Sequence, residues 1–170
     1  MKAKRITLIS VMTTISIIIQ LIENSLPLIP SIPGGKLGFA NIVTILCINL
    51  FDIKTSFVIS FLRPVLSSLI YGGAIHLTYS LSGSLLSFVV LYIVIKRLNK
   101  FSYIGAAISG AVAHNLAQTT VAVLMYSNIY IYMYLPPLLI LSIISGYFTG
   151  FCSTIIINKY KNGKKVNIWN

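Results

Sequence analysis

The stretch "IGAAISGAVAHNLAQTTVAVLMY", residues 104–126, decides the fold. Crossing a hydrocarbon core of about 30 Å takes about 20 helical residues, so this apolar run is long enough to span a membrane. It also carries small residues three or four positions apart, which allow a neighbouring helix to approach closely. They are Gly105, Ala106, Ser109, Gly110, Ala113 and Ala117. The run therefore predicts a helix at the centre of a membrane bundle rather than one facing lipid.

The composition supports a membrane protein. Of 170 residues, 56% are hydrophobic and 9% are charged, against about 25% charged in an average soluble domain. Thirteen Lys and Arg residues oppose only Glu23 and Asp52, which gives a net charge of +11. Such an excess could suit a nucleic-acid binder, but nearly all of the basic residues flank apolar runs, so nucleic acid is excluded as a partner.

Six apolar runs organise the chain. They cover residues 6–26, 39–51, 55–71, 79–95, 104–126 and 134–157. If all six cross and the N-terminus is inside, every basic residue except Lys36 and Arg63 falls on the cytoplasmic side, as the positive-inside rule requires. We therefore expect an all-α membrane protein of the bacterial cell membrane, a six-helix bundle with both termini cytoplasmic. Residues 1–158 would form one membrane domain and residues 159–170 a basic cytoplasmic tail.

The segment "LPLIPSIPGGKLGFAN", residues 26–41, predicts an external loop rich in proline and glycine before a short second helix. Undersized hydrophobic segments often mark transporter binding sites. The backbone at Pro33, Gly34 and Gly35, together with Lys36, could form an anion-binding nest and an external gate. An ordinary loop that closes over the bundle is the alternative.

Arg63 lies in the middle of the third run, where a charge is costly. The adjacent Pro64 removes a helical donor and frees the carbonyl near residue 60 for another partner. Arg63 could be satisfied by carbonyls or by one of the two acids. Alternatively, it could bind an anion, because a guanidinium suits phosphate or carboxylate.

Three polar side chains interrupt the fifth run. His114 and Gln118 share one helical face, and Asn115 lies about 100° round from His114. They could be interhelical hydrogen bonds, or they could line a polar cavity. His76 is expected in an external loop. Small-residue spacing also predicts packing seams on two further runs, at Ser80, Gly83, Ser84, Ser87, Ser142, Gly146 and Gly150.

Ser10 and Thr14 lie four residues apart on the first run. This spacing places them on one helical face, where they could form a docking groove for another membrane subunit or pack within the chain. Cys47 and Cys152 are expected as small buried hydrophobic residues, because neither has a neighbouring cysteine or histidine at metal-ligand spacing.

Some chemistry is missing from the sequence. There is no phosphate-binding loop of ATPases, and no carboxylate cluster of the kind that holds Mg²⁺. Glu23 and Asp52 are expected at opposite membrane faces. We therefore predict a protein that is not an enzyme and that has neither a metal site nor a cofactor.

Five segments in order resemble the Gx transporter family, often labelled heptaprenyl diphosphate synthase component I. They are "PGGKLGFANIVTIL", "LRPVLSSLIYG", "YSLSGSLLSFVV", "SGAVAHNLAQTTVA" and "YLPPLLILSIISGYFTG". The resemblance implies a relative of the S components of energy-coupling-factor transporters. These are six-helix proteins that bind a small nutrient and work with a transmembrane coupling subunit and two ATPases. The polar positions that it carries over are Lys36, Asn41, Arg63, His114, Asn115 and Gln118.

Two hypotheses follow. The first is a substrate-binding subunit for uptake of a small, anionic or amphipathic compound, linked to isoprenoid or menaquinone metabolism. The second is a non-catalytic membrane partner of a soluble polyprenyl diphosphate synthase. A third, simpler possibility is a structural membrane protein in which the buried polar groups only hold helices together.

Overall fold

The computed structural model describes residues 2–25, 38–71, 73–98 and 101–163, and within these ranges it contains helices and no strand. The helices are α1 (Lys2–Ser25), α2 (Asn41–Leu50), α3 (Ile53–Tyr71), α4 (Ala74–Lys96), α5 (Tyr103–Tyr126) and α6 (Leu135–Gly163). A short 3₁₀ helix, η1 (Ile129–Tyr134), precedes α6. The predicted all-α class is confirmed.

Four of the described helical segments are long and apolar enough to cross a membrane, namely Ala3–Glu23, Ile53–Ile70, Ala74–Lys96 and Ile129–Lys161. The chain is therefore a multi-pass membrane protein by helix length and composition. The helix α5 has 24 residues but is not one of these four segments, because its small and polar residues lower its hydropathy. The helix α2 has only 10 residues, a length of about 15 Å. Six crossings thus stay a prediction.

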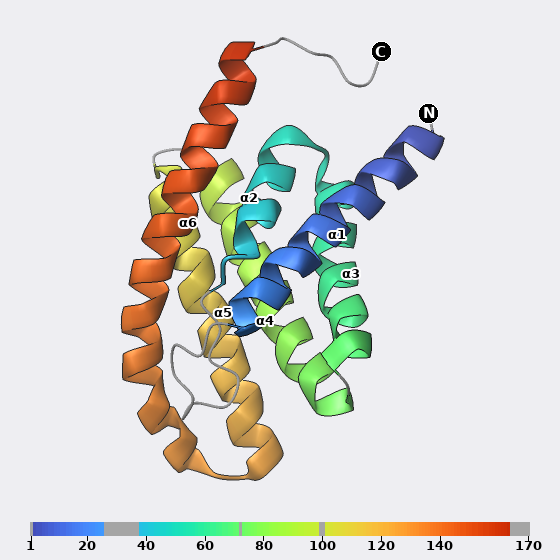
Figure 1. Cartoon of the computed structure of the whole chain (residues 1–170). Coiled ribbons are helices and arrows are strands. Elements are labelled where there is room, and N and C mark those ends of the chain that lie inside the picture. Colours follow the sequence, from blue (N-terminus) through green and yellow to red (C-terminus); the bar gives the residue numbers. More distant parts are fainter. Residues whose placement is uncertain (1, 26–37, 72, 99–100, 164–170) are drawn as a thin grey trace.

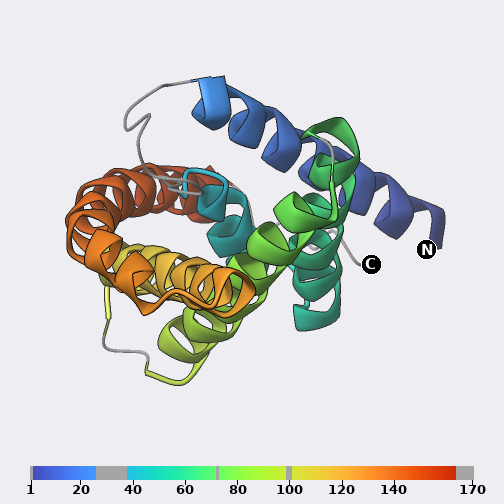
Figure 2. The ribbon, with the colours of Figure 1, turned by 90° about the horizontal axis from the view of Figure 1, so that it is seen from below.

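The helix α5 packs between α4 and α6 (Figure 2). The close approach depends on glycines. A Cβ atom on Gly110 would lie 2.7 Å from Cγ of Leu91 in α4, and one on Gly146 of α6 would lie 2.6 Å from Cα of Ile108. Real Cβ atoms do not approach other atoms so closely, so each position admits no larger residue without movement. The small-residue pattern of α5 correctly predicted its central place.

The start of α1 and the end of α6 lie at the same end of the bundle (Figure 1). At this end Arg5 donates hydrogen bonds to Asp52 and to Thr55, both at 3.0 Å. The basic ends of α4 and α6, at Lys96 and Lys161, also lie here. This arrangement agrees with an even number of crossings and a basic cytoplasmic end, although which side of the membrane it faces is still a prediction.

Two predicted boundaries differ from the structure. The helix α4 begins at Ala74 directly after Gly73, whose φ of 107° is a conformation that glycine adopts readily. His76 therefore lies half-buried in the first turn of a helix, and its predicted place in a loop is wrong. At the other end, α6 continues to Gly163, so the first part of the predicted tail is helical.

Candidate functional site

The site begins at the proline of α3. Pro64 has no amide hydrogen, so the carbonyl of Ser60, four residues earlier, loses its helical partner. The Ser84 hydroxyl of α4 donates to that carbonyl at 2.7 Å. The same hydroxyl accepts a hydrogen bond of 2.9 Å from Nη2 of Arg63. The predicted free carbonyl near residue 60 thus exists, and Ser84 links it to the buried arginine.

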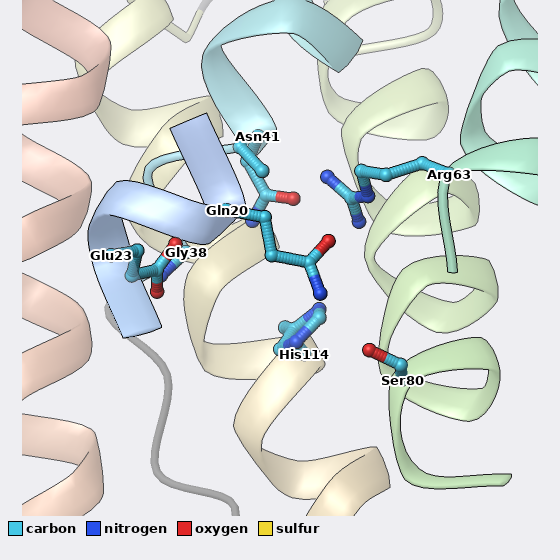
Figure 3. A pocket seen from close by; sticks show the side chains of 8 residues that line it. Gln20, Glu23, Gly38, Asn41, Arg63, Ser80 and His114 are labelled. Carbon is cyan, nitrogen blue, oxygen red and sulfur yellow. The ribbon is translucent and has the colours of Figure 1, made fainter. Parts of the chain in front are cut away.

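A small cavity lies beside Arg63, between α1, α3, α4, α5 and the turn before α2 (Figure 3). It is lined by Gln20, Glu23, Gly38, Ala40, Asn41, Arg63, Ser80 and His114. Its volume is about 10 Å³, which is enough for about one water molecule. Residues from five helices therefore surround a space of roughly one oxygen atom, and most of the lining residues are polar.

Two donors at this cavity have no hydrogen-bond acceptor among the described residues. They are Nη1 of Arg63 and Nδ2 of Asn41. The two residues are only 4% and 1% exposed, so neither donor reaches bulk water. A buried donor without an acceptor costs about 1–3 kcal/mol. These two donors make the cavity a candidate site for an acceptor atom beyond the described residues.

The helix α1 contributes Gln20 and Glu23. Gln20 donates to the Ser67 hydroxyl at 3.2 Å, and Oε1 of Glu23 accepts from the Gly38 amide at 2.6 Å. Glu23 is 5% exposed and is the last residue of the candidate span Ala3–Glu23, so its predicted place at a membrane face stays a prediction. Its side chain is buried because α1 crosses the bundle obliquely and ends near its middle (Figure 1).

The sequence contained a signal for this buried face. Thr13, Ser16, Gln20 and Glu23 recur three or four residues apart, which places them on one side of a helix. All four are buried. This polar stripe is absent from the predictions above, and Ser80 and Ser84 are predicted there only as part of a packing seam.

His114 and Gln118 pack against α4 at Gly83. A Cβ atom on Gly83 would lie 2.8 Å from Cε1 of His114 and 3.0 Å from Cγ of Gln118. His114 lines the cavity, whereas Gln118 lies one turn further along α5 and is not among the lining residues. In the described part of the chain, neither amide atom of Gln118 has a hydrogen-bond partner.

Asn115 faces a different neighbour. Its side-chain amide donates to the Ser142 hydroxyl of α6 at 2.7 Å, and the residue is 2% exposed. It does not line the cavity. Of the two roles considered for Asn115, the structure therefore shows the interhelical hydrogen bond.

The remaining predicted site residues are placed as follows. Lys36 and the gate residues Pro33, Gly34 and Gly35 lie outside the described residues. Ser10 and Thr14 are exposed on α1, where the Thr14 hydroxyl donates to the Ser10 carbonyl at 2.8 Å. Among the described residues, therefore, no other helix covers Ser10 and Thr14.

The described residues contain no group of three or more His, Cys, Asp or Glu that could hold a metal ion. Cys47 is buried and Cys152 is half-buried, and both are free thiols.

These features define a helical membrane protein with a small polar cavity buried inside its bundle. The chain belongs to the heptaprenyl diphosphate synthase component I family, because the model of that family matches residues 12–156. No curated protein and no solved structure matches the chain.

Proposed function

We propose that the chain is a membrane-embedded substrate-binding subunit, similar to the S components of energy-coupling-factor transporters, for a small anionic or amphipathic compound. The observation that carries this proposal is the pair of buried donors, Nη1 of Arg63 and Nδ2 of Asn41, at one cavity. A structural protein would gain stability by pairing these donors with acceptors of its own. A binding protein keeps them available for its ligand.

The donors select the ligand chemistry. Arginine and asparagine amides both bind oxygen acceptors, and arginine suits carboxylate and phosphate in particular. Glu23 lines the same cavity and offsets the charge of Arg63. The residues that line the cavity therefore favour a ligand that presents a single acceptor oxygen over one that presents several charged phosphate groups. In this proposal His114 and Gln118 orient the ligand, Lys36 adds positive charge, and Asn115 supports α5 from behind.

The cavity of about 10 Å³ admits only the end of a ligand. Small-molecule sites usually have volumes of about 300–1,000 Å³. Binding in this proposal therefore moves the cover, which is α1 with the turn at Gly38–Asn41. The polar contacts that hold α1 there include those of Gln20 to Ser67 and of Gly38 to Glu23. The segment with Pro33, Gly34 and Gly35 would gate the entrance from outside.

A substrate-binding subunit needs partners to drive uptake. We propose a transmembrane coupling subunit with ATPases, in a bacterial cell membrane. The exposed face of α1 at Ser10 and Thr14 is the proposed docking surface. The small hydroxyl side chains allow another helix to approach closely, as small residues do at helix interfaces in membranes.

The family description is compatible with a second candidate function, a membrane partner of a soluble polyprenyl diphosphate synthase. Here the chain would be non-catalytic and would hold the diphosphate head while the synthase carries the aspartates for Mg²⁺. Affinity purification of the full chain from its native membrane distinguishes the two. An ATPase with a membrane coupling subunit supports transport, and a soluble synthase supports the partner function.

The binding experiment tests the site itself. Purified protein in nanodiscs is incubated with a metabolite extract, washed and denatured, and the retained small molecules are identified by mass spectrometry. We expect the wild type to retain a carboxylate or phosphate compound and Arg63→Lys to lose it. This substitution keeps the positive charge but replaces the two terminal nitrogens of the guanidinium by one. Equal retention by Arg63→Lys, His114→Ala and the wild type would reject the site.

A further inference from the structure

A second and larger cavity lies at the end of the bundle that holds the start of α1 and the end of α6. Its volume is about 480 Å³, within the usual range for small-molecule sites. It shares no lining residue with the cavity at Arg63. The lining residues are Asn49, Ile95, Lys96, Phe101, Ser102, Tyr103, Ile104 and Thr154.

The walls of this cavity combine apolar and basic groups. Ile95, Phe101 and Ile104 provide the apolar surface, and Lys96 provides an ammonium group. A second ammonium contacts a lining residue, because Nζ of Lys161 donates to the Tyr103 hydroxyl at 3.3 Å and lies 5.9 Å from the centre of the Tyr103 ring. The lining contains no acidic residue.

The backbone adds to the positive potential. The helix α5 begins at Tyr103 after the cap residue Ser102, whose hydroxyl accepts from the Gly105 amide. The first amides of a helix have no partner within the helix, and they carry a partial positive charge. The first turn of α5 forms part of the cavity wall. The ammonium of Lys96, a helix start and an apolar wall therefore meet at one cavity, and the ammonium of Lys161 contacts Tyr103 in its wall.

The two acids of the chain do not neutralise this site. Asp52 is held by Arg5 at 3.0 Å, and Glu23 lines the other cavity. In the predicted topology the site faces the cytoplasm at the depth of the lipid headgroups, where anionic lipids attract basic residues.

We propose that this cavity binds a phosphate ester that carries a hydrocarbon chain. The phosphate lies between Lys96, Lys161 and the first turn of α5, and the chain runs along Phe101, Ile95 and Ile104. Two sources share this chemistry, an anionic phospholipid of the inner leaflet and a soluble isoprenoid diphosphate. The site is separate from the proposed function at Arg63 and stands or falls independently of it.

Native mass spectrometry of the full chain tests the proposal. Phosphatidylglycerol or phosphatidylcholine with identical acyl chains is added to the protein in detergent, and bound lipid is counted. We expect preferential binding of phosphatidylglycerol and about a fivefold loss of its affinity in Lys96→Gln or Lys161→Gln, since a basic residue near an anionic lipid contributes about 1 kcal/mol. Lys54→Gln is the matched control, because Lys54 is exposed and does not line the cavity.

Competition identifies the source. Farnesyl diphosphate that displaces the lipid, where inorganic phosphate does not, indicates the soluble ester, and lipid that resists both indicates the phospholipid. Equal binding of the two lipids, or the same loss in Lys54→Gln as in Lys96→Gln, would overturn the proposal. Arg63→Lys must leave lipid binding unchanged, which separates this result from a failure of the proposed function.

Discussion

The two faces of α5 use buried polar groups in opposite ways. On one face Asn115 donates to Ser142 of α6, next to glycines that bring the helix backbones together. On the other face His114 lines a cavity where Arg63 and Asn41 keep donors without acceptors. His114 and Asn115 are adjacent in sequence, yet about 100° of helix rotation separates them. The comparison teaches that the neighbour of a polar residue decides whether its side chain joins two helices or lines the cavity of the proposed site.

The face toward α6 is the more constrained of the two, so we expect the largest effect there. Gly146→Ala places a methyl group 2.6 Å from Cα of Ile108, which is backbone and cannot rotate away. We expect the free energy of unfolding to fall by about 3 kcal/mol, as in an overpacked core. Unfolding in mixed micelles by a titration with sodium dodecyl sulfate measures it.

Gly105→Ala is the control for this prediction. A methyl group there would lie 3.4 Å from the side chain of Phe101 and meets no backbone. Its effect should lie within about 0.5 kcal/mol of zero. If both variants lose the same free energy of unfolding, any substitution in α5 or α6 would be destabilising, and the close approach at Gly146 would not explain the loss.

The hydrogen bond on the same face should have a smaller effect. Asn115→Ala removes the bond of 2.7 Å to Ser142, and such bonds between membrane helices contribute about 1 kcal/mol. A double-mutant cycle with Ser142→Ala measures the coupling. Additive effects of the two substitutions would contradict a direct interaction.

The cavity face should respond in binding rather than in stability. Gly83→Ala puts a methyl group against the ends of His114 and Gln118, which are side chains that can turn away. We expect a loss of less than about 1 kcal/mol in unfolding, together with weaker retention of the ligand. Unchanged retention would mean that the orientation of His114 is irrelevant to the site.

Lowering the pH should have the smallest effect on the free energy of unfolding, through the surface ion pair of Arg5 and Asp52. Partial burial alone raises the pKa of Asp52, but hydrogen bonds from Thr55 and the charge of Arg5 outweigh it and lower that pKa. A lowered pKa stabilises the folded state above the unfolded pKa of about 3.9, and this contribution is lost as pH falls through the folded value.

The two side chains are 41% and 45% exposed, so the contribution is a few tenths of a kcal/mol. Unfolding of the wild type and of Asp52→Asn, compared from pH 7 to pH 3, checks it. The two should differ at pH 7 and converge in acid. A difference that grows in acid would contradict the sign.

Much of this arrangement could be predicted from the sequence. The length of the apolar runs predicted the helices, and the small residues of α5 predicted its central place, because both depend on local spacing. The loss of the amide at Pro64 likewise predicted a free carbonyl near residue 60. The buried position of Glu23 could not be predicted from hydropathy, since it depends on the tilt of α1. The separate directions of His114 and Asn115 followed from helical geometry, but which neighbour each would meet did not.

The most direct test replaces each of two fully buried asparagines by alanine in turn. Asn41 lines the cavity and Asn115 faces α6. We expect Asn41→Ala to lose the ligand retained from a metabolite extract while its unfolding free energy is nearly unchanged. Asn115→Ala should keep the ligand and lose about 1 kcal/mol of stability. Full retention by Asn41→Ala, with loss of retention in Asn115→Ala, would contradict the central claim that the donors at Arg63 and Asn41 form the binding site.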